Sequence, residues 1–207
     1  MFHQDILEAD YTFVIALSCH NTNLPGSYLS LIHIYLQSMV KWSTQIANMT
    51  HYSVESTVSC IFYNLLLYNL QTLTGDKRSM ISSTLTLTDK HCQVMGLHPG
   101  QFFWQIIKAI QKNAEPIVPR ENVLDTLATT LQCFLSTDNF EDALIKAVNK
   151  GYDSDTVGNI LGGLAGSYYG YQAIPERWLA PLTVKEELMD VVNGFLQLWQ
   201  QKGFTLN

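Results

Sequence analysis

Four glycines spaced four residues apart, at positions 158, 162, 166 and 170, constrain this chain more than any other feature. Residues at this spacing fall on one face of an α-helix. Each glycine costs about 1 kcal/mol of helix propensity relative to alanine, so something else must offset that cost. The stripe therefore predicts a helix against which a neighbouring backbone packs closely.

Two carboxylates and a hydroxyl stand at the start of this helix, on Asp153, Asp155 and Thr156. Asp is a good N-cap, and carboxylates in a first helical turn are stabilised by the helix dipole. The three side chains offer only hard oxygen donors, the set that suits Mg²⁺, Ca²⁺ or Mn²⁺. The spacing also fits a well-capped helix without a ligand. An EF-hand is excluded, because Val157 and Leu164 stand where its acidic ligands belong.

Three motifs come together in this part of the chain: a G-x-D-x-D-T box at 151–156, the glycine-striped helix ending in Tyr168-Tyr169-Gly170, and Ile-Pro-x-x-Trp at 174–178. Together they resemble the C-terminal signature of the ADP-ribosylglycohydrolase family. The stretches 122–134 and 139–144 resemble the two helices that precede the box in this family. The resemblance is close over 118–182 and fainter over 48–75.

The resemblance implies a hydrolase that removes ADP-ribose from a protein side chain or a small acceptor. It also implies a metal site in which Asp153, Asp155 and Thr156 hold Mg²⁺, with Mn²⁺ as the other candidate. In the family, such ions grip the ribose hydroxyls and help charge to develop as the glycosidic bond breaks. The partner would accordingly be ADP-ribose or an ADP-ribosylated protein.

Four further residues are implied as substrate-binding. The loop residues Gly151, Tyr152 and Ser154 would line the ribose pocket. His51, directly after a threonine, resembles the Thr-His pair that the family places beside this pocket, although a histidine at a helix start is more often a cap or a surface residue. No catalytic residue is assigned.

The sequence departs from the family in two places. The family's other metal ligands come from a T-D-D-T box, and the segment Leu7–Thr12 offers one carboxylate where two are needed. We therefore expect a chain that lacks the family's N-terminal part, as a shortened gene product, half of a split protein or a divergent relative. Tyr152 stands where the family usually has glycine, and its ring is expected to narrow the ribose pocket or displace the loop.

Three functions stay open on these grounds. The first is an active hydrolase with a reduced metal site. The second is a non-catalytic relative that binds ADP-ribose or one divalent ion. The third is a helical interaction or remnant domain without a ligand. Whether a second chain completes the site, which linkage is cleaved and the oligomeric state are not set by the sequence.

Composition narrows the class of protein. The 207 residues are 47% hydrophobic and 14% charged, which suits one domain over 1–207. A net charge of −6 without a basic cluster argues against nucleic acid and anionic membranes as partners. The first ten residues lack a basic leader region and no run of eighteen apolar residues occurs, so we expect a cytoplasmic protein. The four cysteines form no C-x-x-C pair, which favours free thiols.

Helical periodicity runs through most of the chain and predicts an all-α, compact multi-helix domain of the ADP-ribosylglycohydrolase type. The stretch 53–73 is apolar enough to be a central buried helix. Asn122, Asn139 and Asp153 are predicted N-caps, Thr183–Glu186 a capping box, and Tyr168, Tyr169 and Trp178 core residues. The expected helices cover 29–48, 53–73, 77–87, a segment from Pro99 to before Pro116, 123–135, 140–150, the glycine helix and 183–202.

Overall fold

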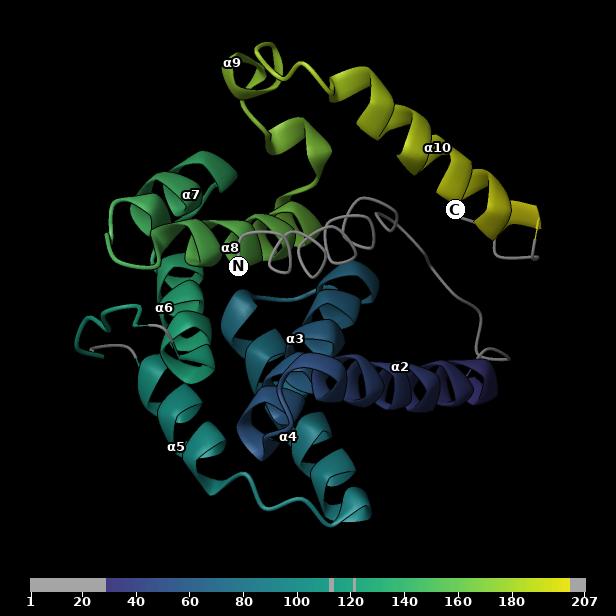
Figure 1. The fold of residues 1–207 in the computed structure, drawn as a ribbon, viewed down its shortest axis with the longest axis vertical. Coiled ribbons are helices and arrows are strands. Elements are labelled where there is room, and N and C mark those ends of the chain that lie inside the picture. The colour runs from purple at the N-terminus through teal and green to yellow at the C-terminus, as the bar shows by residue number, and fades with distance from the viewer. Residues whose placement is uncertain (1–28, 112–113, 121, 202–207) are drawn as a thin grey trace.

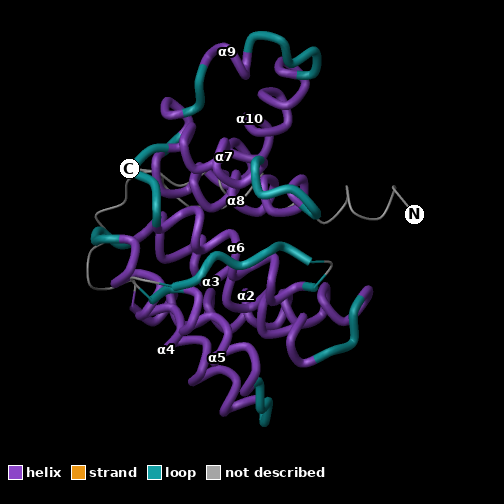
Figure 2. The backbone as a smooth tube through the Cα atoms, turned by 90° about the vertical axis from the view of Figure 1, so that its left-hand side faces the viewer, coloured by secondary structure: helices purple, strands orange, loops and turns teal. Residues whose placement is uncertain are grey.

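The computed structural model describes residues 29–111, 114–120 and 122–201, and every regular element in these ranges is a helix. The expected all-α class is therefore confirmed. The α4 and α5 helices lie at one end of the molecule and α9 and α10 at the other, in two perpendicular views (Figures 1 and 2). In chain order the helices are α2 (Leu29–Thr50), α3 (Val54–Thr72), α4 (Lys77–Met95), α5 (Gly100–Ala109), α6 (Val123–Leu135), α7 (Phe140–Val148), α8 (Ser154–Tyr169), the 3₁₀ turn η2 (Tyr171–Ala173), α9 (Glu176–Leu179) and α10 (Lys185–Gln201).

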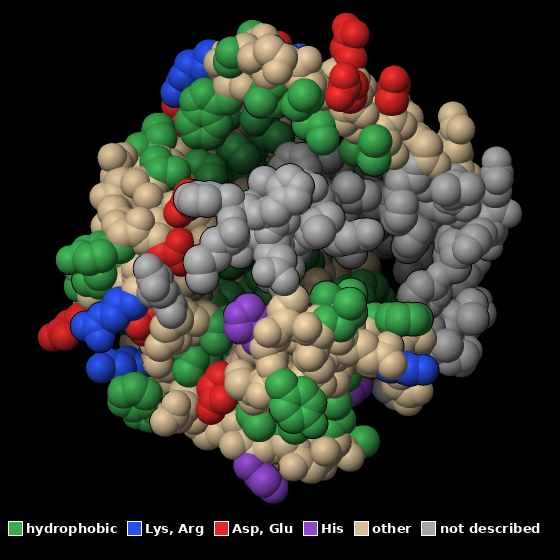
Figure 3. Space-filling view, viewed as in Figure 1, with side chains coloured by type: hydrophobic (Ala, Val, Ile, Leu, Met, Phe, Trp, Pro, Cys, Tyr) green, Lys and Arg blue, Asp and Glu red, His purple; other side chains and the backbone are tan. Residues whose placement is uncertain are grey.

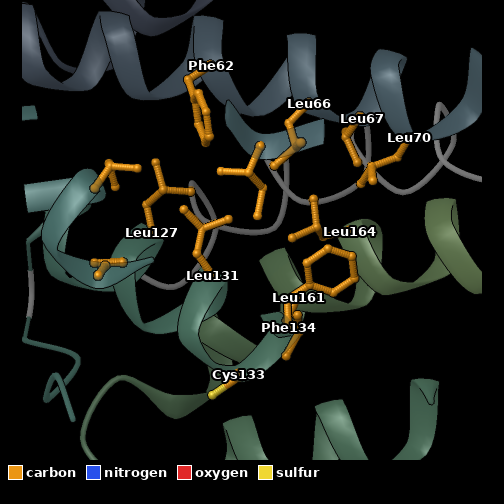
Figure 4. Close-up of a cluster of buried hydrophobic side chains, with 14 of the residues drawn as sticks. Phe62, Leu66, Leu67, Leu70, Leu127, Leu131, Cys133, Phe134, Leu161 and Leu164 are labelled. Carbon is orange, nitrogen blue, oxygen red and sulfur yellow. The ribbon is translucent and has the colours of Figure 1, made fainter. Parts of the chain in front are cut away.

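The α3 helix is the centre of the fold, as its apolar sequence predicts. It packs against α2, α4, α5, α6 and α8. Apolar side chains of α3 face those of α6 and α8 across one core (Figure 4). Because water is excluded around nearly the whole helix, α3 can be apolar on all sides. Its fully buried side chains are Val58, Ile61, Phe62, Leu65, Leu66 and Leu67.

The α3 and α8 helices run in the same direction, as two hydrogen bonds between them show. The Tyr63 hydroxyl donates to the Ile160 carbonyl at 2.8 Å, and eight residues later the Gln71 amide donates to the Ser167 hydroxyl at 3.3 Å. With a rise of about 1.5 Å per residue, the start of α3 lies about 13 Å before the first contact and the start of α8 about 9 Å before it. The segments that precede α3 and α8 therefore lie at the same end of this helix pair.

Short polar side chains fix where several helices begin, because they accept hydrogen bonds from otherwise unpaired N–H groups of the first turn. The predicted caps Asn122 and Asn139 are confirmed, and Ser53 caps α3 in the same way. The bonds run from Leu124 N to Asn122 (2.8 Å), from Asp142 N to Asn139 (2.8 Å) and from Ser56 N to Ser53 (3.1 Å).

Four predicted helix ends are wrong by more than one residue. The α2 helix ends at Thr50 instead of residue 48, and α5 ends at Ala109, well before Pro116. The α4 helix continues to Met95 instead of ending at residue 87. Its polar Thr84 and Thr88 are fully buried, and their hydroxyls donate to backbone carbonyls one turn earlier at 2.8 Å, so burial outweighs the weak helix propensity of threonine. The α7 helix ends at Val148, two residues early. The α10 helix begins at Lys185, one residue after the start that a Thr183 cap predicts.

The glycine stripe does not match its predicted role. A Cβ atom added at Gly158 would lie 3.3 Å from Val148 Cγ1, so α7 packs closely there, but through a side chain and not through its backbone. At Gly162 and Gly166, apart from the adjacent residues and the nearby backbone of α8 itself, no atom of the described residues lies within 4 Å of such a Cβ. Within the described part of the chain, close packing thus explains one glycine of the stripe.

Aromatic residues at the end of α8 and in α9 pack against the core, as predicted. The ring of Tyr168 meets that of Phe134 edge to face, with centroids 5.5 Å apart, and Trp178 lies 6.2 Å from Phe140. Three cysteines of the described part, at 60, 92 and 133, are thiols and not disulfides. Within the same part, no helix is long and apolar enough to cross a membrane.

Candidate functional site

An open cleft of about 540 Å³ lies at the N-terminal end of α8. Small-molecule sites have volumes of about 300–1,000 Å³, so the cleft is large enough for a nucleotide-sized ligand. In the region where α8 begins, acidic side chains lie on the face seen in Figure 1, and basic side chains lie at its left edge beside the α5–α6 loop (Figure 3). The lining residues are Pro119, Arg120, Tyr152, Asp153 and Asp155.

A strained turn brings the chain from α7 into α8. Gly151 has φ of +71° and Tyr152 has φ of +53°, so two successive residues adopt the left-handed conformation. Glycine adopts it readily, whereas a residue with a Cβ atom pays about 1–2 kcal/mol. The tyrosine side chain is 82% exposed, so burial of its ring does not offset this cost. Such strain is a feature of ligand sites, where the backbone is held in shape by its surroundings.

A hydrogen bond joins two of the predicted metal ligands. The Thr156 hydroxyl donates to Asp153 Oδ1 at 2.6 Å, across the first turn of α8. Asp153 occupies the N-cap position, but its side chain accepts no backbone N–H of this turn, so this part of the cap prediction is wrong. The reason is its backbone: ψ is 46°, far from the extended geometry that lets a capping side chain reach back into the turn.

The donor set of the cleft fits Mg²⁺. Asp153 and Asp155 provide two carboxylates, and Thr156 provides a hydroxyl, all within one helical turn. Mg²⁺ is commonly bound by one or two carboxylates and keeps several water ligands. Among the described residues, no group of three or more histidine, cysteine or acidic side chains is placed to hold a metal ion. The described part of the chain thus supplies a partial ligand set and not a closed cage.

The remaining predicted substrate-binding residues, Gly151, Ser154 and His51, do not line the cleft. Gly151 is exposed and Ser154 half-buried, on either side of the two lining residues Tyr152 and Asp153. His51 is exposed, and its Nδ1 lies 3.0 Å from the hydroxyl of Thr50. Because α3 and α8 run in the same direction, this histidine is at the same end of the helix pair as the cleft.

Sequence reasoning missed the opposite wall of the cleft, which Pro119 and Arg120 form. Their loop is held on α6 by Gln132, whose side chain accepts a hydrogen bond from Ile117 N at 3.0 Å and donates one to the Glu115 carbonyl at 2.8 Å. The two prolines at 116 and 119 mark this segment as a loop. Nothing local in the sequence indicates that it faces the start of α8.

A family model described as ADP-ribosylglycohydrolase matches residues 24–204. The chain belongs to the ADP-ribosylglycohydrolase family. It is 28% identical over 155 residues to the ADP-ribosylarginine hydrolase Tri1 of Serratia proteamaculans, covering 75% of this chain and 40% of that protein. It is 45% identical over 65 residues to the ADP-ribosyl-[dinitrogen reductase] glycohydrolase of Rhodospirillum rubrum, covering 31% of this chain and 22% of that protein.

A solved structure titled ADP-ribosylglycohydrolase-related protein complex shares the family fold. It aligns with a TM-score of 0.62 and 26% sequence identity, over 89% of this chain and 56% of the other. The family resemblance of the sequence is therefore confirmed in both sequence and fold. The matched stretches cover less than half the length of each curated relative named above.

Proposed function

We propose that this chain is an Mg²⁺-dependent ADP-ribosyl hydrolase, which cleaves the glycosidic bond between ADP-ribose and a modified protein side chain or small acceptor. The names of its relatives, an ADP-ribosylarginine hydrolase and an ADP-ribosyl-[dinitrogen reductase] glycohydrolase, support the class of reaction. The observation that carries the proposal is the cleft at the start of α8, where Asp153 and Asp155 face a space of nucleotide size.

Asp153, Asp155 and Thr156 would hold the metal, with Mn²⁺ as an alternative to Mg²⁺. When bound, such an ion supplies orientation of the substrate and Lewis-acid stabilisation of developing charge. The chain's own residues prepare the site for it. The Thr156 hydroxyl holds the Asp153 carboxylate in one orientation. The strained backbone at Tyr152 sets the direction in which these groups face the cleft.

Gly151, Tyr152 and Ser154 would contact the ribose, and His51 would lie at the edge of the substrate site. Tyr152 lines the cleft, which fits a direct contact. Gly151 carries no side chain, so it would contact the sugar through its backbone. His51 is exposed at the same end of the α3–α8 pair. The acceptor that leaves would therefore pass an open, solvent-facing edge, which suits a modified side chain on a protein surface.

A second function is favoured by a specific observation, the partial ligand set. The described residues place two carboxylates in the cleft and one hydroxyl hydrogen-bonded to Asp153, whereas the resemblance implies further metal ligands from a T-D-D-T box. A chain that binds ADP-ribose or one divalent ion without turnover fits the same geometry. A helical interaction domain without a ligand is the third candidate, and it predicts neither binding nor turnover.

One set of variants separates the three functions. The full chain is titrated calorimetrically with ADP-ribose, with Mg²⁺ and with EDTA, and release of ADP-ribose from modified protein is measured in parallel. The double variant Asp153→Asn/Asp155→Asn keeps side-chain shape and removes both charges. Glu187→Gln/Asp190→Asn removes two exposed charges from α10 and serves as the matched control.

The hydrolase proposal expects Mg²⁺-dependent binding and turnover that only the first double variant loses. Binding without turnover supports the binding protein and overturns the hydrolase. If neither binding nor turnover occurs under any condition, the cleft is not a ligand site and the interaction domain is the remaining function.

A further inference from the structure

We infer that Arg120 is the residue that binds the diphosphate of the ligand, and that it thereby selects nucleotide-linked ribose over free sugar. This inference rests on the proposed function, because it concerns the same cleft. Of the five residues that line the cleft, Arg120 alone carries a positive charge. It stands on the α5–α6 loop, whereas the two carboxylates stand at the start of α8. The cleft therefore has one cationic and one anionic wall.

The polarity of the two walls fixes the direction in which ADP-ribose lies. Its diphosphate carries negative charge and is repelled by Asp153 and Asp155, which face the cleft from the start of α8. Its ribose hydroxyls are neutral and suit a site of carboxylates and a metal ion. The diphosphate is consequently placed toward Arg120 and the ribose toward α8. A guanidinium can bind phosphate oxygens through two parallel hydrogen bonds, which a lysine cannot do.

Arg120 also lies between two spaces. It lines the main cleft and an adjoining cleft of about 260 Å³, whose other lining residues are Pro116, Ile117, Val118 and Asp125. An extended ligand that contacts Arg120 with its middle can thus reach the carboxylates with one end and the second cleft with the other. ADP-ribose has this construction, because its diphosphate joins a ribose to a nucleoside.

The Arg120 side chain is exposed and available for an anion. Among the residues that the structure describes, it forms no ion pair, while the ion pairs present join Arg177 to Glu141 and Lys185 to Glu176. Its backbone is nevertheless held in place, since Gln132 anchors the preceding residues Glu115 and Ile117 to α6. A charged side chain on an anchored loop loses less conformational freedom on binding than one on a free loop.

The test measures binding and not turnover. The wild-type chain and the variants Arg120→Gln, Arg120→Lys and Lys90→Gln are titrated calorimetrically with ADP-ribose in Mg²⁺ and with ADP in EDTA. Lys90→Gln makes the same charge change at an exposed position on α4, away from the cleft. ADP contains the diphosphate but lacks the second ribose, which is the part of ADP-ribose expected to contact the metal ion. It therefore reports on Arg120 independently of the metal site.

We expect Arg120→Gln to lower the affinity for both ligands by about tenfold or more, because a charge-assisted contact is lost. Lys90→Gln should change these affinities by less than about twofold. Arg120→Lys should recover part of the loss. Affinities for both ligands that are the same in wild-type and Arg120→Gln overturn the inference and leave the hydrolase proposal standing. A wild-type chain that binds neither ligand also overturns it. Binding that depends on Arg120 in a chain without turnover keeps the inference and removes the hydrolase.

Discussion

The hydroxyl of Tyr63, in the middle of α3, donates a hydrogen bond to the backbone carbonyl of Ile160 in α8 at 2.8 Å. Burial around α3 raises the pKa of this hydroxyl, so it stays a donor across the physiological range. The bond joins the central helix to the helix whose start forms the cleft. The bond therefore fixes the position of α8 along the axis of α3. Because Asp153 precedes the first residue of α8, the bond also helps to position Asp153.

Tyr63→Phe tests this contact. Removing the hydroxyl leaves the ring in place and takes away one partly buried hydrogen bond, so we expect the free energy of unfolding to fall by about 1 kcal/mol. Urea denaturation followed by tryptophan fluorescence measures the change. Tyr52→Phe is the matched control, because Tyr52 is 90% exposed, and its stability should stay at the wild-type value. Equal effects of the two substitutions would contradict a specific role for the Tyr63–Ile160 bond.

Tyr152→Gly should stabilise the fold. The left-handed backbone at φ of +53° strains a residue with a Cβ atom, while glycine loses more freedom on folding, so the net gain is about 0.5–1 kcal/mol. Tyr52→Gly supplies the contrast, since Tyr52 is also exposed but is not among the positive-φ residues. It should lose stability. Thermal unfolding of both variants checks the opposite signs, and a loss in both would show that the turn is not strained.

The glycine stripe gives a paired prediction within one helix. Gly162→Ala should raise the free energy of unfolding by about 0.5–1 kcal/mol, because no described atom lies within 4 Å of the added methyl group, apart from the adjacent residues and the nearby backbone of α8 itself. Gly158→Ala places the methyl group 3.3 Å from Val148 Cγ1, so crowding against α7 should cancel or reverse the gain. Chemical denaturation of the two variants gives the comparison. A larger gain at 158 than at 162 would refute this account of the packing.

Stability at alkaline pH should depend on Cys92. Burial, with a smaller effect of the Asp89 carboxylate, raises the pKa of this thiol from 9.0 to about 11. In the unfolded chain the thiol loses its proton near its ordinary pKa, whereas the folded chain keeps it. The folded state thus binds more protons between about pH 9 and 11, and its stability falls as the pH rises through this window.

Cys92→Ala removes this titration. The variant is expected to be less stable at pH 8, because a buried side chain is shortened, but to lose less stability than wild type between pH 9 and 11. Urea unfolding at four pH values across that range gives both slopes. Parallel slopes would show that the thiol titrates alike in the folded and unfolded chains.

The parts of the site that depend on neighbouring residues in the chain could be predicted from the sequence. The caps Asn122 and Asn139 act within one turn, and Asp153 and Thr156 lie three residues apart on one helix. Such contacts are fixed once the helix forms. The departure at Tyr152 was also visible, although its left-handed backbone was not.

The opposite wall of the cleft could not be predicted, because it depends on packing between segments far apart in sequence. Arg120 belongs to a loop whose residues Glu115 and Ile117 are held on α6 by Gln132. The length of α4 has the same origin, since buried Thr84 and Thr88 continue a helix that their propensities disfavour. In both cases tertiary contacts decide a structure that local sequence leaves open.

The Thr156 hydroxyl gives the sharpest test of the proposed metal site, because one substitution removes the hydroxyl and leaves the shape of the side chain almost unchanged. Thr156→Val keeps the shape of the side chain and removes the hydrogen bond to Asp153 Oδ1. The carboxylate then loses its fixed orientation and the site loses one oxygen ligand. We expect Mg²⁺-dependent affinity for ADP-ribose to fall by about tenfold or more, while Thr156→Ser, which keeps the hydroxyl, stays within about threefold of wild type. Calorimetric titrations in Mg²⁺ and in EDTA measure both variants. If valine and serine have the same effect, the hydroxyl does not contribute to Mg²⁺-dependent binding, and Thr156 is not a ligand of a metal ion.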